Sequence, residues 1–206
     1  MKRNIIKIKE LKLASLPDFP DEFPKKYIDE AEDLFNKKFN ESMDLILNLK
    51  TIYSFIDKIN SEYIKNYVSC SKGCSHCCNM DVQLTALEAI FISNSIGIEA
   101  RQNPLTIGHK SPCPFLSEEK KCMIYSLRPL FCRTYHSASD PALCHTPGAY
   151  FVQYGSLETN MGNIVFKGAY EWIQHQNNYA ARGLILDIRD FFPYSKKIIQ
   201  SALLNK

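Results

Sequence analysis

The sequence predicts a mainly α-helical protein in which helical N- and C-terminal segments surround an irregular, cysteine-rich metal-binding core. Three observations predict it: a long stretch without proline or glycine near the N-terminus, a middle region that holds all eight cysteines, and helical periodicity near the C-terminus. With 45% hydrophobic residues, 8 glycines and 10 prolines, the composition is that of a globular protein. We expect a helical extension over 1–66, a cysteine-cluster metal-binding region over 67–150 and a helical segment over 151–206 that packs on the core.

The first helical segment is expected over residues 20–66. Its apolar residues recur at steps of three and four, which is the spacing of an amphipathic helix. Residues 27–65 contain neither proline nor glycine, so nothing in this stretch is a strong helix breaker. The periodicity leaves room for a break near Asn48 or Thr51.

One helix is expected inside the cysteine-rich region. Thr85 is a good N-cap, and Glu88 follows at the spacing of a capping box. Gly97 can end this helix, because glycine readily adopts the left-handed conformation that follows a helix. Residues 99–148 have no clear periodicity and are expected to be irregular.

The C-terminal part is expected to contain a short strand and two helices. The strand is predicted over 149–156, and the helices over 160–176 and 193–204. Aromatic residues on the first of these helices are expected to pack in the core: Phe166, Tyr170 and Trp172.

Charge and hydropathy exclude several functional classes. The net charge is +3 and the basic residues form no block, so we expect no nucleic-acid binding. The first residues lack the apolar run of a signal peptide. The longest apolar stretch, 86–98, contains Glu88 and is too short to span a membrane. We therefore expect a cytoplasmic protein whose thiols stay reduced and which has no membrane span.

The eight cysteines form a compact pattern in the chain. The first four are spaced C-x3-C-x2-C-C and the others follow singly: Cys70, Cys74, Cys77, Cys78, Cys113, Cys122, Cys132 and Cys144. A disulfide framework is disfavoured by the expected compartment. Cys77 and Cys78 also cannot easily pair, because neighbouring Cα atoms lie ~3.8 Å apart, whereas bridged cysteines usually need ~4.4 Å or more.

Two kinds of metal site remain open. Eight thiolates can make two closed four-cysteine zinc sites, but zinc sites usually draw on two C-x2-C pairs, and only Cys74 and Cys77 have that spacing. Iron–sulfur clusters commonly combine three closely spaced thiolates with a distant fourth, which this pattern fits better. We expect an iron–sulfur cluster of the 4Fe-4S type, with Zn²⁺ as the alternative.

Within the first cluster, positions 70, 74 and 77 can face one centre, whereas the side chain of Cys78 must leave the chain at a different angle from that of Cys77. Two arginines near the distal cysteines, Arg128 and Arg133, are expected to bind the cofactor by donating hydrogen bonds to its sulfurs.

Three histidines lie close enough to the cysteines in sequence to replace one as a zinc ligand: His76, His136 and His145. Adjacency alone is weak support for ligation, so His76 and His145 are not expected to be ligands.

The residues between Tyr67 and Thr146 resemble the YkgJ-type cysteine-cluster family. The resemblance rests on the eight cysteines in order, on the Cys-Pro-Phe-Leu unit from Cys113, and on the Tyr-x2-Arg-Pro-x2-Cys-Arg unit from Tyr125. The family is described as zinc- or iron-chelating, so the resemblance implies that all eight cysteines bind metal. A related cysteine-cluster region is found in flagellin lysine N-methylases, but this chain looks too short to match them over their length and shows no Gly-rich methyl-donor loop.

The leading functional interpretation is a cysteine-cluster metalloprotein that acts as a redox or electron-transfer factor with a protein partner or an electron donor or acceptor. The first alternative is a zinc-stabilised, non-catalytic interaction module. The second is a cluster-dependent protein-modifying enzyme. The sequence shows no paired carboxylates, Ser-His-Asp set or phosphate-binding loop, so catalytic residues and enzyme activity are left open.

Overall fold

The structure is a computed structural model, and it describes residues 20, 23–38, 44–71, 73–104, 111–146, 153 and 163–204. Its regular elements within these ranges are α1 (Lys25–Asp33), the π-helix η3 (Leu34–Lys38), α3 (Leu45–Glu62), β1 (Gln83–Thr85), α4 (Ala86–Ile96), α5 (Leu130–Thr134), α6 (Asn163–Ala180), β2 (Ile185–Asp187), α7 (Ile188–Phe191) and α8 (Lys196–Leu204). Short 3-10 helices are η4 (Ile64–Asn66), η5 (His76–Asn79), η6 (Tyr125–Leu127) and η7 (Pro141–His145).

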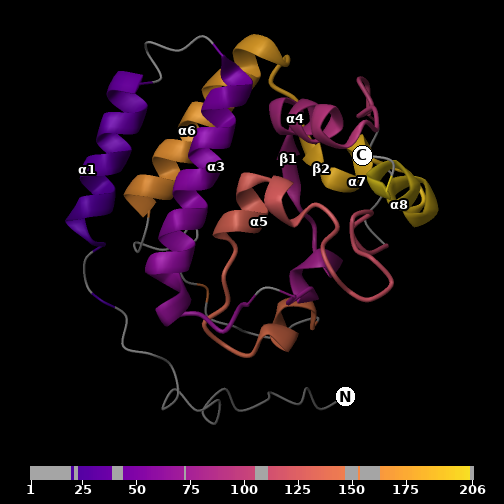
Figure 1. The fold of residues 1–206 in the computed structure, drawn as a ribbon, viewed down its shortest axis with the longest axis horizontal. Helices are drawn as coiled ribbons and strands as arrows, with labels where there is room; N and C mark the ends of the chain where they lie inside the picture. Colours follow the sequence, from indigo (N-terminus) through magenta and orange to yellow (C-terminus); the bar gives the residue numbers. More distant parts are fainter. Residues whose placement is uncertain are drawn as a thin grey trace, which may run out of the picture.

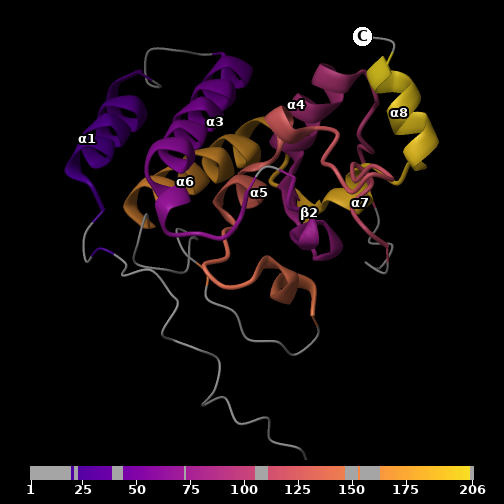
Figure 2. The same cartoon turned by 60° about the horizontal axis from the view of Figure 1, so that its bottom comes forward.

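The architecture is mainly α, as the sequence predicts. The described residues hold seven α-helices and one two-stranded sheet. Helices α1, α3 and α6 lie side by side, while α4, α7 and α8 lie toward the other end of the molecule (Figure 1 and Figure 2). The short helix α5 lies between these two groups and packs on α3.

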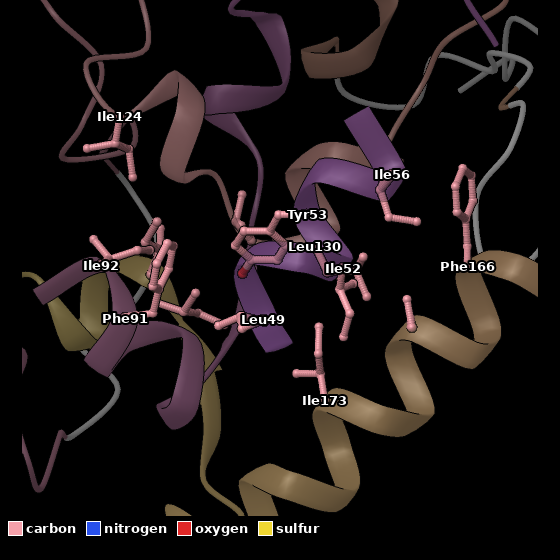
Figure 3. Close-up of a cluster of buried hydrophobic side chains, with 14 of the residues drawn as sticks. Leu49, Ile52, Tyr53, Ile56, Phe91, Ile92, Ile124, Leu130, Phe166 and Ile173 are labelled. Carbon is pink, nitrogen blue, oxygen red and sulfur yellow. The ribbon is translucent and has the colours of Figure 1, made fainter. Parts of the chain in front are cut away.

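Helix α3 is the centre of the hydrophobic core. It begins at the N-cap Asp44, whose carboxylate accepts hydrogen bonds from the backbone N–H groups of Ile46 and Leu47. Its buried apolar side chains recur at helical spacing: Leu49, Ile52, Tyr53, Phe55, Ile56 and Ile59. Figure 3 shows this face between Phe91 and Ile92 of α4 and Phe166 and Ile173 of α6. The core therefore joins segments that are far apart in the sequence.

Helix α4 begins and ends as predicted. The capping box of Thr85 and Glu88 is present, and Gly97 ends the helix at φ 73°. The Glu88 carboxylate is buried and also accepts hydrogen bonds from the Tyr53 hydroxyl and the backbone N–H of Leu130, both at 2.8 Å. One carboxylate thus connects α3 and the starts of α4 and α5, the helix that carries Cys132.

A two-stranded antiparallel sheet brings the C-terminal part of the chain to the cysteine region. Strand β1 pairs with β2 in the register Leu84 to Leu186. Asn177 of α6 is fully buried and supports the start of α4, because its side-chain oxygen accepts a hydrogen bond from the backbone N–H of Leu87 at 3.1 Å. The sequence did not predict this pair of three-residue strands.

Other expectations need correction or lie outside the described residues. Helix α3 runs through Asn48 and Thr51 without a break, and its start is at Asp44 instead. Apart from Gln153, which forms an isolated bridge with Ser137, the strand expected over 149–156 falls outside the described residues. The C-terminal helices are confirmed with shifted bounds, as α6 and α8, and the short helix α7 precedes α8.

The aromatic residues expected in the core lie there or against it. Phe166 is fully buried, while Tyr170 and Trp172 are partly buried and pack against the hydrophobic core. Within the described ranges, no helix combines the length and the apolar character needed to cross a membrane.

Candidate metal centre

The eight cysteines lie on short, irregular segments around η5 and α5, and all are free thiols. Cys70 and Cys74 precede η5, which itself carries Cys77 and Cys78. Cys113 and Cys122 lie on the segment that leads to η6, Cys132 is in α5 and Cys144 is in η7. None of these elements exceeds five residues, so backbone contacts and buried side chains must hold the thiols in place.

A cavity of about 60 Å³ lies among six of the cysteines. Its wall includes these thiols: Cys74, Cys77, Cys78, Cys113, Cys122 and Cys132. The backbone supports the arrangement, since the N–H of Cys113 donates to the carbonyl of Cys78 at 2.7 Å. Apolar residues such as Val82, Ile124 and Phe131 form much of the remaining wall, which also includes Asp81 and Arg128. The fold thus brings together cysteines from both halves of the predicted cluster around one apolar space.

The other two cysteines lie around Ser137. The backbone N–H of Ser137 donates to Sγ of Cys70 at 3.2 Å, and its buried side chain is a hydrogen-bonding partner of Cys144. Negative charge on Cys74, Cys144 or Cys77 would raise the pKa of Cys70, and negative charge on Cys77 or Cys74 would raise that of Cys144, so these four cysteines lie near one another. Segments η5 and η7 pack on each other, which places this second group beside the cavity.

Burial favours the neutral form of several of these thiols. Burial raises the pKa of Cys70 to about 12, and it also raises the pKa values of Cys113 and Cys132. For Cys77, a hydrogen bond with Cys78 is the largest cause of the raised pKa, followed by burial. In the described residues, no group of three or more His, Cys, Asp or Glu side chains is arranged so that it could hold a metal ion. Metal binding must therefore deprotonate the thiols and draw them together.

Arg189 of α7 fixes the segments that carry Cys78 and Cys113. Its buried guanidinium pairs with Asp187 at 2.9 Å, and the two side chains are 3% and 2% exposed. It also donates to the carbonyls of Ser111 at 2.7 Å and Met80 at 3.0 Å, with a longer contact of 3.4 Å to the carbonyl of Cys78. One buried ion pair thus holds two cysteine segments whose thiols line the same cavity.

Arg133 fixes the segment that carries Cys132. Its guanidinium is fully buried, lies 4.2 Å from the centre of the Tyr53 ring and pairs with Asp57 of α3. It donates to the carbonyls of Ser126 and Arg128. These contacts explain why an arginine follows Cys132, but they direct the guanidinium to backbone carbonyls and Asp57. The expected contact between Arg133 and a bound cofactor remains a prediction.

Arg128 faces the thiols more directly. It is partly buried and lines the six-cysteine cavity. Its guanidinium lies 3.7 Å from the centre of the Tyr125 ring, and its Nε donates to the Tyr125 carbonyl at 3.0 Å. It interacts electrostatically with Cys77, Cys122 and Cys132, where its positive charge opposes the rise in the thiol pKa values.

The three histidines considered as possible zinc ligands differ in their surroundings. The Nε2 of His136 lies 3.0 Å from the side-chain oxygen of Asn60, whose amide donates to the Arg133 carbonyl. This pairing assigns Nε2 of His136 as a donor. Burial lowers the pKa of His136 to about 4, so the ring is neutral near pH 7. His76 lies in η5 beside the cysteines, and the side chain of His145 lies outside the described part of the chain.

The residues present fit a thiolate-bound metal group. Thiolates are the ligands that zinc and iron–sulfur clusters share, and the donors converge from four segments on one largely apolar space. Buried negative charge needs compensation, and arginines 128, 133 and 189 lie next to the cysteine segments. The structure thus supplies the donor atoms that such a group requires, and Arg128, which has no carboxylate partner among the described residues, supplies a compensating positive charge beside them.

Sequence reasoning missed two residues of this site. Ser137 has no motif that marks it, because its role depends on a backbone contact to Cys70. Arg189 lies 111 positions after Cys78 and outside the cysteine region. The signal that could have located it is the acidic pair around it, since Asp187 and Asp190 form the capping box of α7.

Comparison with known proteins agrees with this geometry. Residues 69–158 match the family model CxxCxxCC, described as "Putative zinc- or iron-chelating domain". The match includes all eight cysteines but neither α3 nor α7, which supply Asp57 and Arg189. The searches of curated proteins and of solved structures give no match. Residues 69–158 of this chain therefore match the CxxCxxCC family of cysteine-cluster proteins.

Proposed function

We propose that this protein is an iron–sulfur metalloprotein that transfers electrons to or from a protein partner. The observation that carries the proposal is the cavity of about 60 Å³ among six thiols. On the same measure, about 10–15 Å³ holds one water molecule. A single zinc ion lies ~2.3 Å from each of four sulfurs and needs no such space. A polynuclear cluster does need it, so the size of the cavity favours iron and sulfide over zinc.

We further propose that the eight cysteines divide into two neighbouring groups of four. The first group is Cys70, Cys74, Cys77 and Cys144, and the second is Cys78, Cys113, Cys122 and Cys132. Support for the first comes from the electrostatic contacts of Cys70 and Cys144 with Cys74 and Cys77. The backbone bond between Cys113 and Cys78 and the contacts of Cys113 with Cys132 and Cys122 support the second.

Cys77, a member of the first group, lies where the two proposed groups meet. It hydrogen-bonds to Cys78 and also interacts with Cys70, Cys122, Cys132 and Cys144. Adjacent residues in a 3-10 helix point about 120° apart, so Cys77 and Cys78 can serve neighbouring groups without a distortion of the backbone.

The surrounding residues have roles suited to electron transfer. An iron–sulfur cluster supplies a reversible one-electron couple whose potential depends on charge, hydrogen bonds and solvent exposure. Arg128 places a positive charge beside Cys77, Cys122 and Cys132, which favours the more negative, reduced state. The ion pairs of the buried Arg133 and Arg189 side chains hold the backbone of the cysteine segments, so that little reorganisation accompanies a change of charge.

Redox titration tests the electron-transfer role. Protein purified without oxygen should lose part of its visible absorption when dithionite is added and regain it on mild reoxidation. One of the two states should give an electron paramagnetic resonance signal. The Arg128→Gln variant should have a lower reduction potential, because it lacks a positive charge next to the thiolates. A control variant, Arg101→Gln, changes an exposed arginine and should leave the potential unchanged. Absence of any reversible spectral change would contradict the proposal.

A further inference from the structure

A second hollow lies next to the six-cysteine cavity, and its residues do not all belong to the metal centre. Its volume is about 710 Å³, within the range of small-molecule sites. The two hollows share part of their walls, namely Cys74, Cys77, Tyr125, Arg128, Cys132 and Tyr135. Helix α3 and the segment after it also contribute Asn60 and Lys65 to the lining. A molecule bound there would lie against the thiols.

Apart from the cysteines, the lining of this second hollow offers positive charge to a bound anion. Its described lining contains three formally charged side chains, Asp57, Lys65 and Arg128. The Asp57 carboxylate is paired with Arg133, which neutralises it. His136 also lines the hollow, and burial keeps it neutral near pH 7. Lys65 and Arg128 are therefore the two positive charges of this lining that have no carboxylate partner among the described residues.

Arg128 presents a preorganised binding group. The Tyr125 ring fixes the plane of its guanidinium at 3.7 Å, and the bond from Nε to the Tyr125 carbonyl fixes its rotation. Its two terminal nitrogens have no hydrogen-bonding or ion-pair partner among the described residues. A guanidinium held in this way matches the two oxygens of a carboxylate, and little side-chain entropy remains to be lost on binding.

We infer that this hollow binds a small molecule that carries one or more carboxylates, held by Arg128 together with Lys65 and the Asn60–His136 pair. The inference rests on residues that are present whatever metal the cysteines bind. It goes beyond the proposed electron-transfer role, because it assigns a small-molecule site next to the metal centre.

Calorimetry on the full-length, metal-loaded protein tests the inference. The probes are acetate, malonate, succinate and glutarate, with uncharged succinamide and inorganic phosphate for comparison. At least one dicarboxylate should bind more tightly than acetate, and succinamide should not bind. Loss of one charge-assisted interaction corresponds to an affinity about ten- to a hundredfold lower, which is the expected effect of Arg128→Gln. Lys65→Gln should weaken dicarboxylates more than acetate.

Two controls separate this inference from the proposed function. Arg101→Gln removes an exposed arginine elsewhere and should leave carboxylate affinity unchanged. Metal content is measured in every sample, and affinities are compared per metal-loaded chain. A loss of metal therefore cannot be mistaken for a loss of carboxylate binding in the second hollow. The inference is overturned if no carboxylate binds, if only phosphate binds, or if Arg128→Gln and Lys65→Gln both bind as tightly as the unaltered protein.

Discussion

Replacement of Cys77 by serine is expected to remove most of the bound metal, whereas replacement of Cys78 should remove about half. The physical reason is the position of Cys77, whose thiol interacts with members of both proposed four-cysteine groups. Serine is nearly the same size as cysteine but is a poor ligand for soft metal centres. Cys78→Ser affects only the group that contains Cys113, Cys122 and Cys132. Metal content per chain and the visible spectrum after purification without oxygen check both expectations.

The matched control is Ser126→Ala, which changes an exposed side chain in η6, near the same segments. It should keep the full metal content, since only the backbone carbonyl of Ser126 takes part in the contacts described above. If Cys78→Ser loses all its metal just as Cys77→Ser does, the eight thiolates form one interdependent unit and the division into two groups is wrong.

Replacement of Arg189 by methionine should destabilise the fold and lower the metal content together. The substitution leaves the Asp187 carboxylate buried without its ion-pair partner, and breaking a buried pair in this way costs about 3–5 kcal/mol. For a chain of this length, that corresponds to a thermal midpoint lower by roughly 10 °C. The segments of Cys78 and Cys113 lose their shared anchor at the same time.

Thermal unfolding of the metal-loaded protein, followed by circular dichroism, measures the first effect, and metal analysis measures the second. Arg101→Met is the control, because it makes the same substitution at an exposed arginine. It should change the free energy of unfolding by less than about 0.5 kcal/mol. An Arg189→Met protein with an unchanged midpoint and full metal content would show that the buried pair does not support the site.

The parts of the fold that depend on local sequence could be predicted. Thr85, Glu88 and Gly97 set the two ends of α4 through contacts within a few residues, and the pattern of α3 predicts its buried face. The start of α3 at Asp44 was missed because the expected helix ran through it, although Asp is a strong N-cap. Local rules thus predict helices well and their exact boundaries less well.

Contacts between distant segments could not be predicted from one sequence. Strands β1 and β2 have three residues each and pair across about a hundred positions, so neither carries a recognisable pattern. Arg189 reaches the carbonyls of Met80 and Ser111 from a helix outside the cysteine region. The position of Arg133 after Cys132 predicts a contact with the cofactor. Its described bonds, however, go to Asp57 and to backbone carbonyls. Sequence spacing identified the candidate donors, and the fold shows what surrounds them.

The measurement that tests the central claim most directly is iron, zinc and acid-labile sulfide per chain in protein purified without oxygen, together with its visible spectrum. An iron–sulfur protein should be brown, absorb broadly toward the violet and contain iron and sulfide in nearly equal amounts. A colourless, fully folded protein with stoichiometric zinc and no sulfide would contradict the account and favour a zinc-stabilised module.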